Sequence, residues 1–319
     1  MGTGRGPRVP QPVPLGQLPR QVTIYEVGPR DGLQNESAVL PASVKATFIA
    51  MLAAAGLGII EATSFVRPEW VPQLADAEDL LAGLDLAGDV RYPVLVPNLR
   101  GLGRALDRGV REIAIFGSAT ETFARRNLNT GMDESVAMFA PVVSRARDEG
   151  LNVRAYVSMC FGDPWEGRVP IAQVVKIGQR LLDLGCTQLS LGDTIGVGTP
   201  GHVAALLGAF FEAGIGPDRL AVHFHDTYGQ ALANTLSALQ CGITVIDASA
   251  GGLGGCPFAD SATGNLATED LVWMLHGLGV DTGIDLPALT RASQWMARQL
   301  GRPAPSRAVQ ALAQGSEES

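Results

Sequence analysis

The chain has 319 residues, of which 46% are hydrophobic, and this is enough for one large domain with a sizeable core. A net charge of −8 and a pI of about 5.1 argue against nucleic acid and anionic membranes as partners. No apolar run approaches the roughly 20 residues that span a bilayer. The four cysteines are widely spaced, which favours free thiols in a reducing compartment over a disulfide framework.

Short β-like runs alternate with helical stretches eight times along the chain. This alternation predicts an α/β fold with parallel strands and crossover helices, and eight units favour a closed (β/α)8 TIM barrel over an open doubly wound sheet. The predicted strands are 22–26, 59–64, 92–97, 112–117, 153–158, 188–193, 220–226 and 244–249. The helices that follow them are predicted near 42–56, 73–83, 99–108, 133–149, 170–184, 200–213, 229–240 and 267–277.

The flanks of the barrel differ from it in composition. Residues 1–20 are rich in proline and contain no acidic residue, so we expect a disordered N-terminal arm. Residues 301–319 end in GSEES, and we expect a flexible C-terminal tail. The catalytic barrel is therefore predicted to occupy 21–300.

Polar residues gather at the ends of the predicted strands, where the active sites of such barrels lie. Residues scattered over a surface would instead fall in the helices. The residues at strand ends or in the loops that follow are Arg30, Asp31, Glu61, Ser64, Asn98, Ser158, Asp193, His223, His225, Asp226 and Asn265.

His223 and His225 are the strongest single signal. Residues i and i+2 of a strand point to one face, so both imidazoles should converge on one point. Two histidines that only make core hydrogen bonds are the alternative, but the polar residues at the other strand ends favour a bound metal. Asp31 and Asn265 would add two oxygens, and this mixed set suits octahedral Mg²⁺ or Mn²⁺ better than a closed zinc site.

Two further residues suggest the chemistry. Arg30 can stabilise an oxyanion that develops on the substrate. Cys256 lies in a glycine-rich loop, 251–265, with little to pack against, which favours a proton donor or acceptor; a Cys-His hydrolytic pair is the alternative. The only lysines, Lys45 and Lys176, fall in predicted helices outside the barrel, so Schiff-base chemistry is not expected.

Six long motifs resemble the 3-hydroxy-3-methylglutaryl-CoA lyase family. The similarity runs from about residue 20 to about residue 300 and so covers the whole predicted barrel. It implies a metal-dependent TIM-barrel enzyme that cleaves 3-hydroxy-3-methylglutaryl-CoA into acetyl-CoA and acetoacetate. The motifs are VTIYEVGPRDGLQNE, EATSFVRPEWVPQLAD, YPVLVPNLRG, SLGDTIGVGTPG, AVHFHDTYGQALAN and GGLGGCPFADSATGNLATEDLV.

The resemblance also implies residue roles. Arg30 would stabilise the enolate of acetyl-CoA, Cys256 would protonate it or relay its proton, and Glu61 would anchor the groups around the metal. Either His223 or Asp193 would remove the hydroxyl proton of the substrate. The implied ligands of Mg²⁺ or Mn²⁺ are Asp31, His223, His225 and Asn265, and the expected substrate contacts are Arg30, Gln34, Asn98 and Ser158.

Three alternatives stay open at this point. Many family members have a cysteine before PYEG, where this chain has FGDPWEG with Asp163 and Trp165, and this departure allows a preference for a longer 3-hydroxy-3-alkylglutaryl-CoA. An acyl-CoA-condensing synthase of the same superfamily is the second alternative, and a non-catalytic barrel that binds acyl-CoA is the third. We expect a homo-oligomer, a dimer or higher, in the bacterial cytoplasm, with a role in leucine degradation or ketone body formation.

Overall fold

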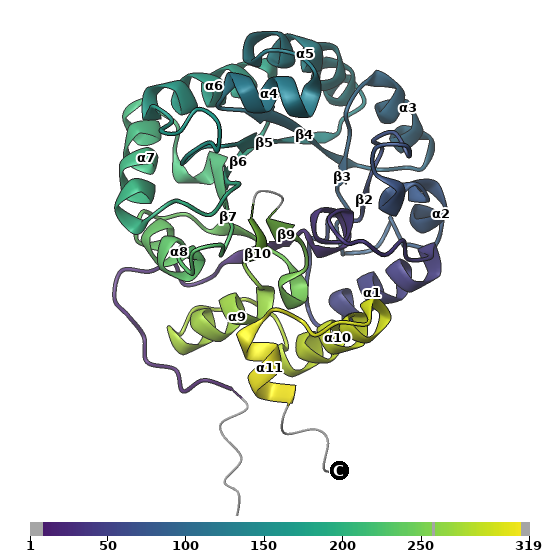
Figure 1. Cartoon of the computed structure of the whole chain (residues 1–319), viewed down its shortest axis with the longest axis vertical. Helices are drawn as coiled ribbons and strands as arrows, with labels where there is room; N and C mark the ends of the chain where they lie inside the picture. Colours follow the sequence, from purple (N-terminus) through teal and green to yellow (C-terminus); the bar gives the residue numbers. More distant parts are fainter. Residues whose placement is uncertain (1–8, 257–258, 314–319) are drawn as a thin grey trace, which may run out of the picture.

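Eight parallel strands form one curled sheet at the centre of the molecule (Figure 1). This computed structural model describes residues 9–256 and 259–313. Neighbouring strands follow the order β1-β8-β7-β6-β5-β4-β3-β2. The strands are β1 (Thr23–Glu26), β2 (Thr63–Ser64), β3 (Val94–Leu95), β4 (Glu112–Ser118), β5 (Asn152–Ser158), β6 (Gln188–Asp193), β7 (Leu220–Phe224) and β8 (Val245–Ala248).

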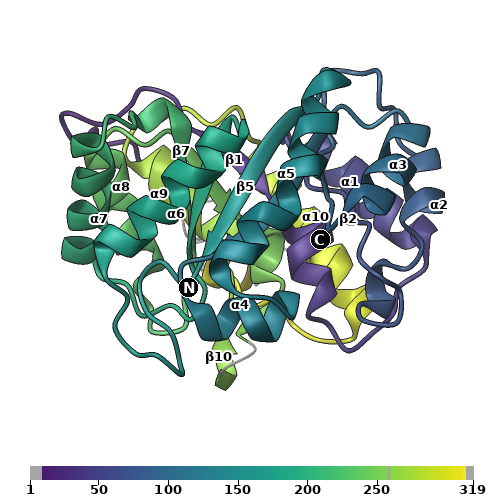
Figure 2. The same ribbon diagram turned by 90° about the horizontal axis from the view of Figure 1, so that it is seen from above.

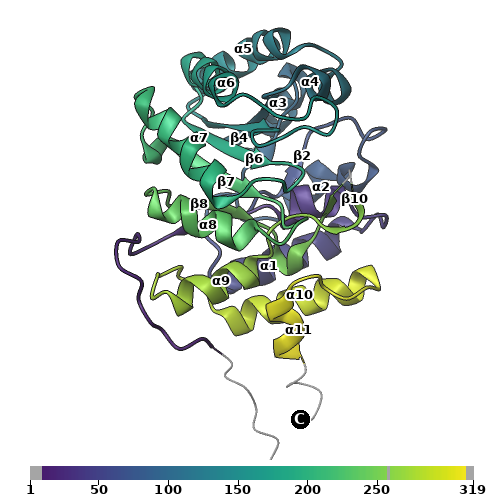
Figure 3. The ribbon, with the colours of Figure 1, turned by 60° about the vertical axis from the view of Figure 1, so that its left-hand side comes forward.

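Helices cover the outside of the sheet, as Figures 1 and 2 show. Each of the eight predicted helices is present, and α4, α10 and α11 were not predicted. Figure 3 shows α9, α10 and α11 packed together at one end of the molecule. The helices are α1 (Ala42–Ala54), α2 (Ala77–Ala82), α3 (Leu99–Asp107), α4 (Glu121–Leu128), α5 (Met132–Asp148), α6 (Ile171–Leu184), α7 (Pro200–Glu212), α8 (Ala231–Gln240), α9 (Thr268–Gly277), α10 (Leu286–Leu300) and α11 (Arg307–Ala313).

The two end strands of the sheet, β1 and β2, meet at a seam without a regular ladder. An isolated parallel bridge joins Glu26 to Ile60. The Glu26 N–H donates to the Ile59 carbonyl (3.1 Å), and the Glu61 N–H donates to the Glu26 carbonyl (2.8 Å). The eight predicted parallel strands are thus confirmed, in a curled half-barrel that is not closed by a ladder between β1 and β2.

The segments beside the barrel also make defined contacts. The Val13 N–H donates to the carbonyl of Gly277 in α9 (2.8 Å). Near the other end of the described chain, Ser306 Oγ donates to Asp270 Oδ1 (2.7 Å), and the Ala308 N–H in α11 donates to the same oxygen (2.7 Å). Among residues 9–256 and 259–313, no helix combines the length and the apolar character needed to cross a membrane.

Close contact between α6 and the sheet depends on Gly178. A Cβ placed there would lie 2.7 Å from the Phe210 ring and 2.9 Å from Leu189 Cδ1. Leu189 alternates along β6 with Ser190, so Leu189 faces the helices and Ser190 faces the interior of the curled sheet. A Cβ placed on Gly208 in α7 would meet no neighbouring atom within 4 Å.

These two glycines give a matched test of packing. Gly178→Ala should destabilise the protein by about 1–2 kcal/mol, because overpacking outweighs the gain in helix propensity. Gly208→Ala should stabilise it by about 0.5–1 kcal/mol, because only the propensity changes. Urea unfolding of both variants measures this, and equal effects of the same sign would contradict the packing argument.

Candidate functional site

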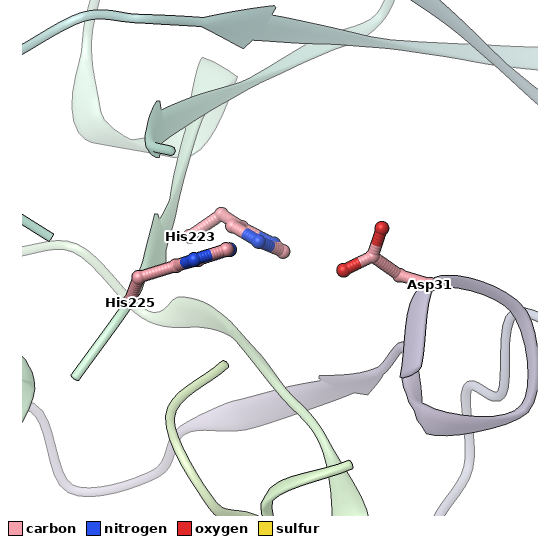
Figure 4. A group of neighbouring side chains, drawn as sticks. All are labelled: Asp31, His223 and His225. Atoms are coloured by element: carbon pink, nitrogen blue, oxygen red, sulfur yellow. The ribbon is translucent and has the colours of Figure 1, made fainter. Parts of the chain in front are cut away.

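Asp31, His223 and His225 converge at one end of the curled sheet (Figure 4). One ligand atom from each residue lies within 4.8 Å of the others. Asp31 belongs to the π-helical turn η1 (Gly28–Gly32) that follows β1, His223 lies in β7, and His225 follows that strand. The centroids of the two imidazole rings are 5.4 Å apart, which confirms that both side chains lie on the same face.

Asn265 lies beside this group. An isolated antiparallel bridge pairs it with His225, and its Nδ2 donates to Asp31 Oδ2 (2.8 Å) and to the Leu253 carbonyl (3.2 Å). Two buried atoms, Asn265 Oδ1 and His225 Nδ1, have no hydrogen-bond partner within the described part of the chain. A buried polar atom without a partner is costly, so these atoms fit a site that holds a cation.

The charges of the group also suit metal binding. Burial would raise the pKa of Asp31, but Arg30 and His223 lower it to about 2. Burial, with His223 nearby, lowers the pKa of His225 to about 3. At neutral pH the pair therefore offers an ionised carboxylate and a neutral imidazole, which are the forms that bind a metal ion.

Arg30 is held beside the group by two acids and a ring. Its Nε donates to Glu61 Oε2 (2.7 Å) and one Nη donates to Asp31 Oδ1 (2.8 Å). The guanidinium lies 5.2 Å from the centroid of the Tyr156 ring, and Tyr156 Oη donates to Glu61 Oε2 (2.9 Å). Burial would lower the pKa of Arg30, but the two carboxylates keep it well above its usual value, so the cation is permanent.

Sequence reasoning missed three interior residues: Arg154 and Tyr156 in β5, and Asp247 in β8. Asp247 Oδ2 lies 3.3 Å from His223 Nδ1, and Arg154 donates to both oxygens of Asp247. A signal was present in the sequence, because VRAYVS and TVIDAS each place a charged residue inside a short apolar strand. Such a residue is rarely buried without a partner.

The other predicted residues lie around this centre, each with its own contacts. Asp193 is buried, and its carboxylate accepts the N–H groups of Val197 (3.0 Å) and Gly198 (2.9 Å) in the loop after β6. Asn98 caps α3 by accepting the Gly101 N–H (2.9 Å). Ser158 ends β5 opposite Ser118.

Gln34 and Cys256, like Asn98 and Ser158, have no described side-chain contact with the centre. Gln34 is half-buried just after η1. The side chain of Cys256 lies outside the described part of the structure, so its predicted role stays a prediction. The backbone of Cys256 belongs to β9 (Gly255–Cys256), which pairs antiparallel with β10 (Ala259–Thr263), and β10 protrudes beyond the neighbouring helices (Figure 2).

Glycines allow the loop after β8 to approach the loop after β1. A Cβ on Gly32 would lie 2.7 Å from Leu253 Cβ and 2.9 Å from Ser249 Oγ. Gly254 has φ +94°, and a Cβ there would lie 2.9 Å from Asn265 Nδ2. The two glycines therefore let Asn265 reach Asp31.

The unusual FGDPWEG segment is folded around Asp163. This buried carboxylate accepts Thr120 Oγ1 (2.7 Å) and the N–H groups of Trp165 (2.7 Å) and Glu166 (2.8 Å). The Trp165 ring lies under Arg126 of α4, with the guanidinium 4.4 Å from the ring centroid. Asp163 thus ties the loop after β5 to the loop after β4.

Comparison with known proteins shows the family of the chain. The profile of the HMGL-like family matches residues 21–296. The chain belongs to the HMGL-like family. It is 52% identical to the Danio rerio protein named 3-hydroxy-3-methylglutaryl-CoA lyase, cytoplasmic, over 93% of this chain and 88% of that protein. It is 50% identical to the mitochondrial hydroxymethylglutaryl-CoA lyase of Mus musculus, over 93% and 91% of the two chains.

A solved structure supports the same family. The crystal structure of hydroxymethylglutaryl-CoA lyase from Pseudomonas aeruginosa matches with a TM-score of 0.92 and 46% identity, over 94% of this chain and 100% of that one. The resemblance to the 3-hydroxy-3-methylglutaryl-CoA lyase family that the motifs suggested is thus confirmed. The Asp31–His223–His225 group lies within the matched range.

The metal-binding group can be tested with two of the four histidines. His225→Ala should weaken Mn²⁺ binding by at least about 100-fold. Loss of a residue that only hydrogen-bonds to a metal ligand typically weakens metal binding by about 10–100-fold, and loss of a ligand itself should weaken it more. His276→Ala should leave binding unchanged, because His276 lies in α9 and contacts Thr282. Isothermal titration calorimetry measures both, and unchanged affinity in His225→Ala would exclude this site.

Proposed function

We propose that this protein cleaves 3-hydroxy-3-methylglutaryl-CoA into acetyl-CoA and acetoacetate. The main support is the Asp31–His223–His225 group beside the braced Arg30, in a chain about half identical to proteins named as this lyase. The relatives do not favour a longer acyl-CoA substrate or a condensing synthase.

The proposed reaction breaks the bond between C2 and C3 of the glutaryl chain. The hydroxyl on C3 loses its proton and becomes the ketone of acetoacetate. The electrons of the broken bond pass to the thioester fragment, which leaves as an enolate and takes up a proton to become acetyl-CoA. The enzyme therefore needs a base, a cationic partner for the enolate, and an acid.

The residues divide these tasks. Arg30 is the cationic partner, and its position is set by Glu61 and by the ring of Tyr156. Its hydrogen bonds to the described residues use Nε and one Nη, and the second Nη is proposed to bind a substrate oxygen. The sequence leaves His223 and Asp193 as candidates for the base. Because His223 would hold the cation, Asp193 is the proposed base, and Cys256 is the proposed acid.

A divalent cation, Mg²⁺ or Mn²⁺, would be held by Asp31, His223, His225 and Asn265. When bound, the ion acts as a Lewis acid that lowers the pKa of a coordinated hydroxyl and fixes its orientation. The mixed set of two oxygens and two nitrogens, without a thiolate, favours these ions over a closed zinc site.

We also propose a barrel closed at the β1–β2 seam, so that 21–300 form a (β/α)8 TIM barrel. The isolated bridge at Glu26 and Ile60 supports this, since it joins the two end strands. A homo-oligomer in the bacterial cytoplasm and a role in leucine degradation or ketone body formation stay predictions.

The deciding experiment is an assay of acetoacetate formation from 3-hydroxy-3-methylglutaryl-CoA. Turnover should require Mg²⁺ or Mn²⁺ and stop after EDTA treatment. A parallel assay with a longer 3-hydroxy-3-alkylglutaryl-CoA tests whether the Asp163 loop changes the preference for the acyl chain. Release of CoA from acetyl-CoA in the presence of a 2-keto acid would indicate synthase activity. Absence of acetoacetate from folded, metal-loaded protein would refute the proposed function.

Removal of the positive charge of Arg30 tests its proposed role. Arg30→Gln should lower kcat by about 10²–10³-fold, because the enolate then loses its cationic partner. Arg298→Gln, on the exposed side of α10, should keep full activity. Steady-state kinetics, with circular dichroism to check the fold, makes the comparison, and near-normal kcat in Arg30→Gln would remove this residue from the mechanism.

The pH profile tests Asp193 as the base. Burial raises the pKa of Asp193 to about 6. A base must be deprotonated, so kcat/KM should fall as pH drops through about 6, and Asp193→Asn should remove this acid limb along with most activity. If Asp193→Asn keeps the limb, Asp193 only anchors the loop after β6 and is not the base.

A further inference from the structure

The imidazole of His223 has a buried carboxylate behind it. His223 and Asp247 are register partners in the parallel pair β7–β8, so their side chains lie on the same face of the sheet. His223 Nδ1 lies 3.3 Å from Asp247 Oδ2. A carboxylate accepts hydrogen bonds and cannot donate them, so this contact requires the proton of the neutral imidazole to be on Nδ1.

Three hydrogen bonds from two residues hold Asp247 in place. Arg154 Nη2 donates to Oδ1 (2.5 Å), while Arg154 Nη1 (3.1 Å) and Ser190 Oγ (2.7 Å) donate to Oδ2. The side chain of Asp247 has no exposed surface, and that of Arg154 is 7% exposed. The Arg154 guanidinium also lies 3.9 Å from the centroid of the Tyr25 ring, so the arginine cannot easily change position.

We propose that Asp247 is a positioning residue of the metal centre. It keeps the proton of His223 on Nδ1 and the ring in one orientation, so that Nε2 is left as the atom for the ion, and Arg154 with Ser190 holds Asp247 in place. Carboxylates that accept the second N–H of a ligand histidine act in this way in metal sites, and they raise the basicity of the ligand.

This inference rests on the metal site proposed above but goes beyond its ligands. The His225 ring has no such brace, because its Nδ1 lacks a hydrogen-bond partner among the described residues. The two histidines are therefore unequal. Asp247 assigns the proton of His223, whereas no described side chain accepts a hydrogen bond at Nδ1 of His225.

The test needs a variant that removes Asp247 without leaving Arg154 as an unpaired buried charge. The double change Arg154→Met with Asp247→Leu replaces both charges by apolar side chains of similar length. Arg154→Met alone keeps Asp247 bound to His223 and Ser190, and so separates the two residues. Lys45→Met with Asp76→Leu removes a partly buried ion pair between α1 and the residue before α2, as a control for general destabilisation.

The first measurement is ¹⁵N NMR of histidine-labelled, metal-free protein at alkaline pH, where the rings are neutral. Only His202, His223, His225 and His276 contribute, so assignment by single substitution is practical. Wild type, Arg154→Met and the Lys45/Asp76 control should show His223 protonated on Nδ1. The Arg154/Asp247 double variant should show the Nε2–H form, which free histidine prefers.

The second measurement is Mn²⁺ affinity by calorimetry. The Arg154/Asp247 double variant should bind about 10–100-fold more weakly than wild type, and the Lys45/Asp76 control should bind normally. A double variant with both the wild-type tautomer and the wild-type affinity would overturn the inference. Failure of wild type to bind Mn²⁺ would instead refute the metal site, while the NMR result would still decide whether Asp247 orients His223.

Discussion

A charge enclosed by a curled sheet needs an opposite charge at hydrogen-bond distance, because the strands exclude water. Two arginines enter the interior here, and each meets a buried acid: Arg30 meets Glu61, and Arg154 meets Asp247. Removing one member of such a pair typically costs about 3–5 kcal/mol, so the four residues fix one another. The orientation of the site depends on this constraint.

Tyr156 connects the two ion pairs. Its ring lies 5.2 Å from the guanidinium of Arg30 and 5.1 Å from that of Arg154, and its hydroxyl donates to Glu61. The cation proposed to face the substrate and the acid beside His223 therefore belong to one continuous network. A cation held by such a network is already in position before charge develops on a ligand, which is the condition for electrostatic stabilisation without reorganisation.

Local sequence patterns predict the repeating units and the residues at strand ends well. The spacing of His223 and His225 gives their common face, and the alternation of strands and helices gives eight units in order. Contacts between side chains on different strands cannot be predicted from local patterns. Asp247 meets His223 only because β7 and β8 have a particular register, and the bond from Tyr156 to Glu61 joins residues 95 positions apart. The helix α4 is inserted between β4 and the predicted helix α5, and α10 follows α9 with no strand between them, so both fall outside the repeating pattern.

The β1–β2 seam has a consequence for the evolution of the chain. The backbone joins these strands at only a few atoms around Glu26, yet the Arg30–Glu61 pair links the segments that follow β1 and precede β2. Arg30, which is proposed to face the enolate, thus also holds the sheet together at the seam, where the backbone hydrogen bonds are few. Active-site residues often reduce stability in exchange for activity. Here the proposed catalytic role of Arg30 and its structural role require the same side chain. A substitution of Arg30 would therefore be selected against for two reasons, the loss of activity and the loss of the link across the seam.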